Sequence, residues 1–116
     1  MSNTTDIGKD GEDIAEKLLS SKGFTTVARN YHTRMGEIDL IVKNKELIVF
    51  VEVKTRHNRG FGDAVAFVTA SKRRKILTTA QVWLMQHKTA LQPRFDVVEV
   101  YTGTNETVHI ENAFGG

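Results

Sequence analysis

Two adjacent β-strands that carry charge in their interiors most constrain how this chain can fold. The residue pattern predicts strands over residues 37–43 and 47–55, both rich in β-branched side chains. Asp39, Glu52 and Lys54 lie inside these segments, where a buried strand usually has valine or isoleucine. Because an unpaired buried charge is strongly destabilising, we expect these groups to be paired with one another or to hold a metal.

The register of the hairpin decides how these charges meet. A two-residue turn at Lys45-Glu46 would place Asp39 directly opposite Glu52, whereas a turn at Asn44-Lys45 would place it diagonally. Since alternate residues of a strand share a face, both registers put Asp39 on the face of Glu52 and Lys54. Direct partners have Cβ atoms roughly 5 Å apart and diagonal ones about 7–8 Å apart, so either arrangement lets two carboxylates bind one cation.

The opposite face of both strands is predicted to be apolar, and is formed by Ile38, Leu40, Val42, Val49, Val51 and Val53. Ile41 and Phe50 share the charged face, so we expect both faces to be buried. Two close carboxylates repel each other, and a divalent cation would relieve that repulsion. Lys54 would then face a phosphate group or an attacking water. The pattern indicates a metal-dependent phosphodiester hydrolase, and a plain acid–lysine salt bridge is the alternative.

The remaining pattern predicts one α/β (α+β) domain over residues 1–116, with helices flanking a central mixed sheet. The predicted order is α-β-β-β-α-β-β. Gly23 is expected to end the first helix at its C′ position. A loop is predicted over 56–62, and 63–70 could be a turn or a short helix. The predicted helices are 6–22 and 71–87, and the other strands are 24–31, 94–101 and 106–111.

Composition excludes some classes of site and favours an anionic partner. The chain has no cysteine, which excludes disulfides and zinc–thiolate sites, and its net charge is +2 with a pI near 9.0. We expect a cytoplasmic protein without a membrane segment, because no apolar run is long enough and no signal sequence is evident. Basic side chains at the start of the second helix and around the loop predict contacts with a nucleic-acid backbone, although a basic run can also be solvated surface. They are Arg34, Arg56, Arg59, Lys72, Arg73, Arg74 and Lys75.

Several of these motifs resemble a known family. Glu12, Asp39 and Glu52-Val53-Lys54 resemble the E…D…ExK signature of the PD-(D/E)xK, or restriction-endonuclease-like, superfamily. More closely, the chain resembles the uncharacterised bacterial YraN-like family from Gly8 to about Tyr101. The most specific matching stretches are Gly36-Glu37-Ile38-Asp39-Leu40-Ile41 and Val49-Phe50-Val51-Glu52-Val53-Lys54-Thr55-Arg56. Ile38 stands where the signature's name has proline.

The resemblance implies an αβββαβ core similar to Holliday-junction resolvases. Asp39, Glu52 and the backbone carbonyl of Val53 would bind Mg²⁺ or Mn²⁺. Lys54 would orient the water or stabilise the transition state, and Glu12 would reach in from the first helix. Periodicity alone does not choose between Glu12 and Asp10 for that role. Two other acids carry separate predictions. We expect Glu37 to be a further ligand or to pair with Arg34, and we expect Asp96 to be structural and to bond an arginine or backbone amides.

The resemblance implies a nuclease that acts on DNA, including branched or structured DNA. The intact set of two acids and a lysine favours this function over a non-catalytic nucleic-acid-binding module, which would be expected to lose one member. A structural partner in a DNA-processing complex is a third hypothesis. Resolvase-like relatives act as dimers, which is consistent with a homodimer here.

Overall fold

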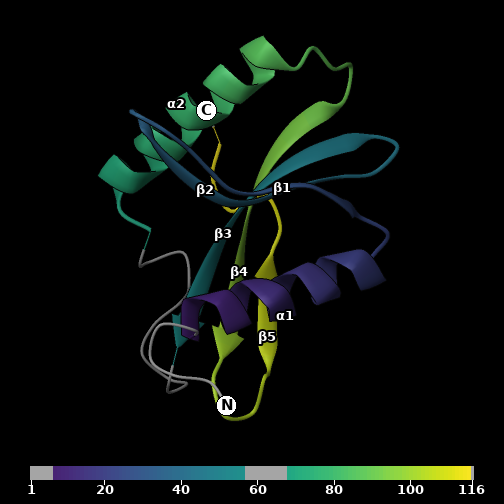
Figure 1. Cartoon of the computed structure of the whole chain (residues 1–116), viewed down its shortest axis with the longest axis vertical. Coiled ribbons are helices and arrows are strands. Elements are labelled where there is room, and N and C mark those ends of the chain that lie inside the picture. Colours follow the sequence, from purple (N-terminus) through teal and green to yellow (C-terminus); the bar gives the residue numbers. More distant parts are fainter. Residues whose placement is uncertain (1–6, 57–67, 116) are drawn as a thin grey trace.

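The computed structural model describes residues 7–56 and 68–115 and has the predicted order of elements (Figure 1). Each observed bound lies within two residues of the predicted one. Arg56 belongs to a strand, and the rest of the predicted 56–62 loop lies outside the described residues, as does most of 63–70. The elements are α1 (Ile7–Ser21), β1 (Thr25–Thr33), β2 (Gly36–Lys43), β3 (Leu47–Arg56), α2 (Ala70–Gln86), β4 (Gln92–Tyr101) and β5 (Thr107–Ile110).

The strands form one mixed sheet in the order β1-β2-β3-β4-β5. β3 and β4 pair in parallel, while the other neighbours are antiparallel. A parallel pair needs a crossover connection, and α2 lies in the connection between β3 and β4. α1 and α2 lie on opposite sides of the sheet (Figure 1), so the predicted mixed sheet flanked by helices is confirmed. Neither of these helices has the length and apolarity needed to cross a bilayer.

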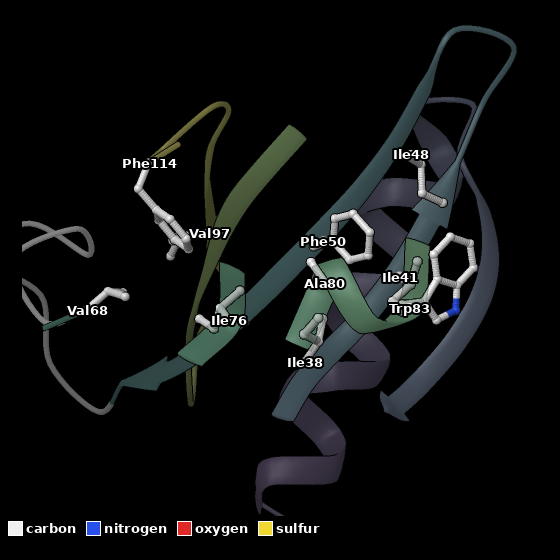
Figure 2. Packing of buried hydrophobic residues seen from close by; sticks show 10 residues of the cluster. All are labelled: Ile38, Ile41, Ile48, Phe50, Val68, Ile76, Ala80, Trp83, Val97 and Phe114. Carbon is white, nitrogen blue, oxygen red and sulfur yellow. The ribbon is translucent and has the colours of Figure 1, made fainter. Parts of the chain in front are cut away.

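Both faces of the central strands β2 and β3 are covered, as predicted. On one face, side chains of α2 pack against β2 and β3 (Figure 2), and the ring of Trp83 meets Phe50 edge-on at 5.9 Å between centroids. On the other face, Ala15 and Leu19 of α1 pack against the apolar side of β3 and its neighbours. β3 is therefore covered on both sides, which makes charge in its interior costly unless that charge is paired.

Gly23 ends α1 as predicted. Its φ of 93° is in the left-handed region that glycine adopts readily. Its N–H donates to the carbonyl of Ser20 (3.0 Å), and the N–H of Phe24 donates to the carbonyl of Leu19 (3.1 Å). This is a Schellman motif, and it turns the chain from α1 into β1.

One expectation about the two faces is wrong. Ile38 packs with Ile41 on the α2 side of the sheet rather than with Leu40 on the α1 side (Figure 2). Regular alternation fails here because the β1–β2 ladder is irregular. Asn30 has a left-handed φ of 52°, and β1 contains a further register shift between Thr26 and Ala28. The β2–β3 ladder accordingly begins only at Leu40.

Candidate active site

The hairpin between β2 and β3 has the first of the two predicted registers. Leu40 pairs with Val51 and Lys43 with Ile48, while the N–H of Asn44 donates to the carbonyl of Leu47 (3.0 Å). The Asn44 side chain also accepts from the N–H of Leu47 (2.8 Å), which fixes a two-residue turn at Lys45-Glu46. The paired ladder begins at Leu40, and this register extended by one residue would align Asp39 with Glu52.

Asp39 and Glu52 line one hollow of about 130 Å³ on the α2 side of the sheet. The N–H of Val53 donates to Asp39 Oδ2 at 2.8 Å, which ties this carboxylate to β3. Glu52 is 5% exposed. The other residues around the hollow are Gly36, Glu37, Lys72, Lys75 and Ile76.

The two carboxylates strongly influence each other. The pKa of Asp39 is raised from 3.8 to about 7, first because of burial and then because of the negative charge of Glu52. The hydrogen bond from Val53 and the charge of Lys72 act in the opposite direction. A raised pKa of this kind marks a carboxyl group whose ionised form is disfavoured by burial and by a neighbouring acid, as is common at functional sites.

Lys72 of α2 supplies part of that positive charge. Its Nζ lies 2.8 Å from Glu52 Oε1, so a residue predicted to contact nucleic acid is paired with a predicted metal ligand. Burial lowers the pKa of Lys72, but its bond to Glu52 and the charges of Glu52 and Asp39 outweigh this and raise it. The pKa of Lys54 is lowered by burial and then by the charge of Lys72.

Gly36 brings α2 close enough for this pairing. A Cβ at residue 36 would lie 3.1 Å from the Cβ of Lys75 and 3.2 Å from its carbonyl oxygen. These separations are tighter than ordinary contacts, so a side chain here would push α2 away from β2. The missing side chain of Gly36 therefore helps to hold Lys72 over Glu52.

Glu12 is not among the residues that line the hollow. Its carboxylate lies 3.4 Å from Arg29 of β1, which also contacts Asp13 (2.7 Å) and Glu16 (3.1 Å). Asp10, the alternative by periodicity, lines a different hollow beside Thr55. In the two described segments, no three acidic or histidine side chains converge to hold a metal. The structure thus brings together Asp39, Glu52, Lys54 and Lys72 and leaves Glu12 with Arg29.

The predicted basic residues differ in their exposure and in their partners. The Arg56 side chain is 14% exposed and forms an ion pair with Glu99. Arg73 Nε donates to the carbonyl of Val68 at 2.9 Å. One N–H at the start of α2, that of Lys72, donates to the Thr69 side chain (3.1 Å) and so is already bonded. Arg34, Arg74 and Lys75 are exposed, and Arg59 lies outside the described residues.

Two buried polar clusters accompany the site. Glu99 is 3% exposed, accepts a hydrogen bond from the Tyr101 hydroxyl and forms an ion pair with Arg56. Glu99 is not among the predicted site residues, although a glutamate among the valines of β4 is the same signal that identified Glu52. The prediction that Asp96 is structural is confirmed, because its buried carboxylate accepts from both Arg94 Nε and Nη2 at 2.9 Å and from the N–H of Asn112 at 3.0 Å.

The residues of the hollow fit a hard divalent cation in their donor chemistry. Asp39 and Glu52 offer carboxylate oxygens, and burial together with the charge of Glu52 raises the pKa of Asp39, which a cation would oppose. Mg²⁺ is commonly bound through one or two carboxylates together with waters and substrate phosphates. Two protein carboxylates therefore suffice for such a site. Val53 is predicted to bind the metal through its backbone carbonyl. The hydrogen bond from Val53 to Asp39 involves its N–H instead, so the carbonyl ligand stays a prediction.

Fold and site define an α+β protein with a mixed five-stranded sheet and a hollow lined by acidic and lysine side chains on a central strand. Residues 11–100 match the family described as "Uncharacterised protein family UPF0102". The chain belongs to this family, and the predicted membership of an uncharacterised bacterial family is confirmed.

Relatives from several bacteria match over nearly the whole chain. A UPF0102 protein of Saccharophagus degradans is 48% identical, over 98% of this chain and 97% of its own length. One from Clostridioides difficile is 41% identical, over 97% of this chain and 99% of its own length. Among solved structures, SfsA of Pyrococcus furiosus in complex with Ca²⁺ is 14% identical, with a TM-score of 0.36. That match covers 94% of this chain but only 64% of SfsA, and a score this low does not establish a shared fold.

Proposed function

We propose that this protein is a metal-dependent nuclease of the PD-(D/E)xK superfamily that hydrolyses DNA phosphodiester bonds. The observation that carries the proposal is the convergence of Asp39 and Glu52 in one hollow, where Lys72 pairs with Glu52 and Lys54 lies close enough to interact with both acids. A structural salt bridge would need only one acid and one lysine. Two acids with a strongly raised pKa on one of them are typical of a functional site.

The chain's own residues have distinct tasks in this reaction. Asp39 and Glu52 would hold the divalent cation, Mg²⁺ or Mn²⁺, which when bound lowers the pKa of a water and neutralises charge on the phosphate. The backbone of Val53 fixes the Asp39 carboxylate by its hydrogen bond. Lys54 follows Glu52 at the next position on the same face, so its Nζ can donate to a phosphate oxygen or orient the attacking water. Glu12 acts indirectly, because its charge also helps to raise the pKa of Asp39.

A non-catalytic nucleic-acid-binding module is the second candidate. The ion pair between Glu12 and Arg29 favours it, since one acid of the superfamily signature is engaged outside the hollow. Exposed Arg34, Arg74 and Lys75 would serve a phosphate backbone in either case. The two candidates differ in whether the acid pair is needed for an activity or only for the fold.

A cleavage assay separates the two candidates. Linear, flapped and four-way-junction DNA are incubated with Mg²⁺ or Mn²⁺ and the wild type, Glu52→Ala or Lys54→Ala. We expect wild-type cleavage and a loss of about 100-fold or more in each variant. Glu46→Ala is the matched control, because Glu46 is an exposed carboxylate in the turn of the same hairpin. Its activity should equal that of the wild type.

Circular dichroism on each variant checks that the fold is intact. Activity that persists in both Glu52→Ala and Lys54→Ala would rule out this site. Tight DNA binding by a wild type that cleaves none of the substrates would establish the binding module instead.

A further inference from the structure

We propose that Lys72 is a built-in counter-ion of the carboxylate pair, which must leave Glu52 before a divalent cation binds, so that cation and phosphodiester bind cooperatively. This inference rests on the proposed nuclease function. It adds a positioning residue from α2 that the superfamily signature in the sequence does not contain.

The geometry makes Lys72 and a cation direct competitors for Glu52. Lys72 Nζ is 2.8 Å from Glu52 Oε1, and the carboxylate is almost fully buried. A divalent cation would approach the same carboxylate to about 2.1 Å. An ammonium group and a divalent cation on one small buried carboxylate repel each other, so cation binding requires that the ion pair open.

Lys72 is able to make that movement. Its side chain is 42% exposed and carries the ammonium group on a flexible four-carbon stem, whereas the backbone of α2 is held by close packing at Gly36. The ammonium group can therefore swing off Glu52 while remaining next to the hollow. Lys75 lies one turn further along α2 and lines the same hollow, but it forms no ion pair with any residue of the described segments.

The sum of charges explains why the phosphodiester should take part. With every group ionised, the three lining acids Glu37, Asp39 and Glu52 are balanced by Lys72 and Lys75 of the lining and by the adjacent Lys54. The hollow is then neutral overall, and a neutral hollow attracts a divalent cation weakly. A bound cation leaves two excess positive charges, which a phosphodiester partly neutralises while the released Lys72 donates to one of its oxygens. By thermodynamic reciprocity, the anion then strengthens cation binding as much as the cation strengthens anion binding.

Calorimetric titration with Mn²⁺ tests this without any measurement of cleavage. The proteins are the wild type, Lys72→Met, Lys72→Arg and Lys75→Met, each with and without dimethyl phosphate as a minimal phosphodiester. Lys72→Met should bind Mn²⁺ about tenfold more tightly than the wild type, because the competing ammonium is gone. Lys72→Arg should stay close to the wild type, and Lys75→Met is the matched control that removes a charge from the same hollow without opening an ion pair.

Dimethyl phosphate should tighten Mn²⁺ binding to the wild type, and it should do so less in Lys72→Met. Unchanged or weaker Mn²⁺ binding by Lys72→Met, beside a wild type that binds Mn²⁺, overturns the counter-ion role and leaves the nuclease proposal standing. If the wild type binds no Mn²⁺ with or without the anion, the nuclease proposal itself fails, and this inference fails with it. If Lys75→Met strengthens Mn²⁺ binding as much as Lys72→Met does, the loss of any positive charge explains the effect. That result would also overturn the inference.

Discussion

Asp39→Asn should stabilise the protein at alkaline pH while abolishing the proposed activity. The pKa of Asp39 is raised in the folded protein because burial and Glu52 disfavour its ionised form. Its contribution to stability is therefore present at acidic pH and is lost as the pH rises through about 7. Asparagine removes this penalty, and its amide oxygen can still accept the hydrogen bond from Val53.

The magnitude follows from the two pKa values. The rise from 3.8 to about 7 corresponds to about 4 kcal/mol of destabilisation once Asp39 is ionised in both states. At about pH 5 the folded protein still holds the proton, so only part of this penalty is present. The stability gap between variant and wild type should therefore widen by about 3 kcal/mol between about pH 5 and about pH 8.5.

Urea unfolding followed by circular dichroism, in the presence of EDTA, measures this gap at both pH values. Glu37→Gln is the matched control, because Glu37 lines the same hollow from the same strand but is exposed. This control measures the effect of removing an exposed carboxylate from the rim of the hollow. A gap for Asp39→Asn that is equal at both pH values would refute the argument that burial and Glu52 keep this carboxyl protonated.

Two further predictions concern the packing around the site. Asp96→Asn should lower the free energy of unfolding by about 3–5 kcal/mol at neutral pH, because it breaks a buried ion pair with Arg94. Burial alone would raise the pKa of Asp96, but its bonds to His109 and Arg94 lower it, so in urea titrations this deficit should shrink as the pH falls through the lowered pKa. Gly11→Ala would place a Cβ 2.4 Å from Thr55 Oγ1, so we expect a loss of about 1–3 kcal/mol in thermal or urea unfolding. Thr55→Ala should rescue it, and a double variant as unstable as Gly11→Ala alone would contradict the steric explanation.

The sequence predicted the elements and the meeting of Asp39 with Glu52 because both depend on local rules. Strand alternation and a short turn determine which side chains of a hairpin face each other, and these rules act over a few residues. The exception shows their limit. Ile38 pairs with Tyr31 of β1, directly after Asn30 with its left-handed φ, and the sequence of β2 does not reveal an irregularity that lies in its neighbour.

The position of Lys72 could not be predicted for a different reason. Its pairing with Glu52 depends on how α2 crosses the sheet, which is a tertiary property. A basic run at a helix start suggests phosphate binding, yet one of its members is paired with Glu52. Likewise, Arg56 was assigned to a loop, but β3 continues through it and turns its side chain towards Glu99 on the parallel strand β4. A pairing between residues far apart in sequence is visible only in the folded sheet.

The irregularities of β1 also bear on how this sheet meets other chains. β1 is one border of the sheet, and its register shift and left-handed Asn30 interrupt the row of amide and carbonyl groups that a foreign strand would need. The other border, β5, is only four residues long. Both borders are thus poor templates for strand addition and for aggregation. A homodimer of this protein would accordingly have to form through side chains on the faces of the molecule rather than by extending the sheet.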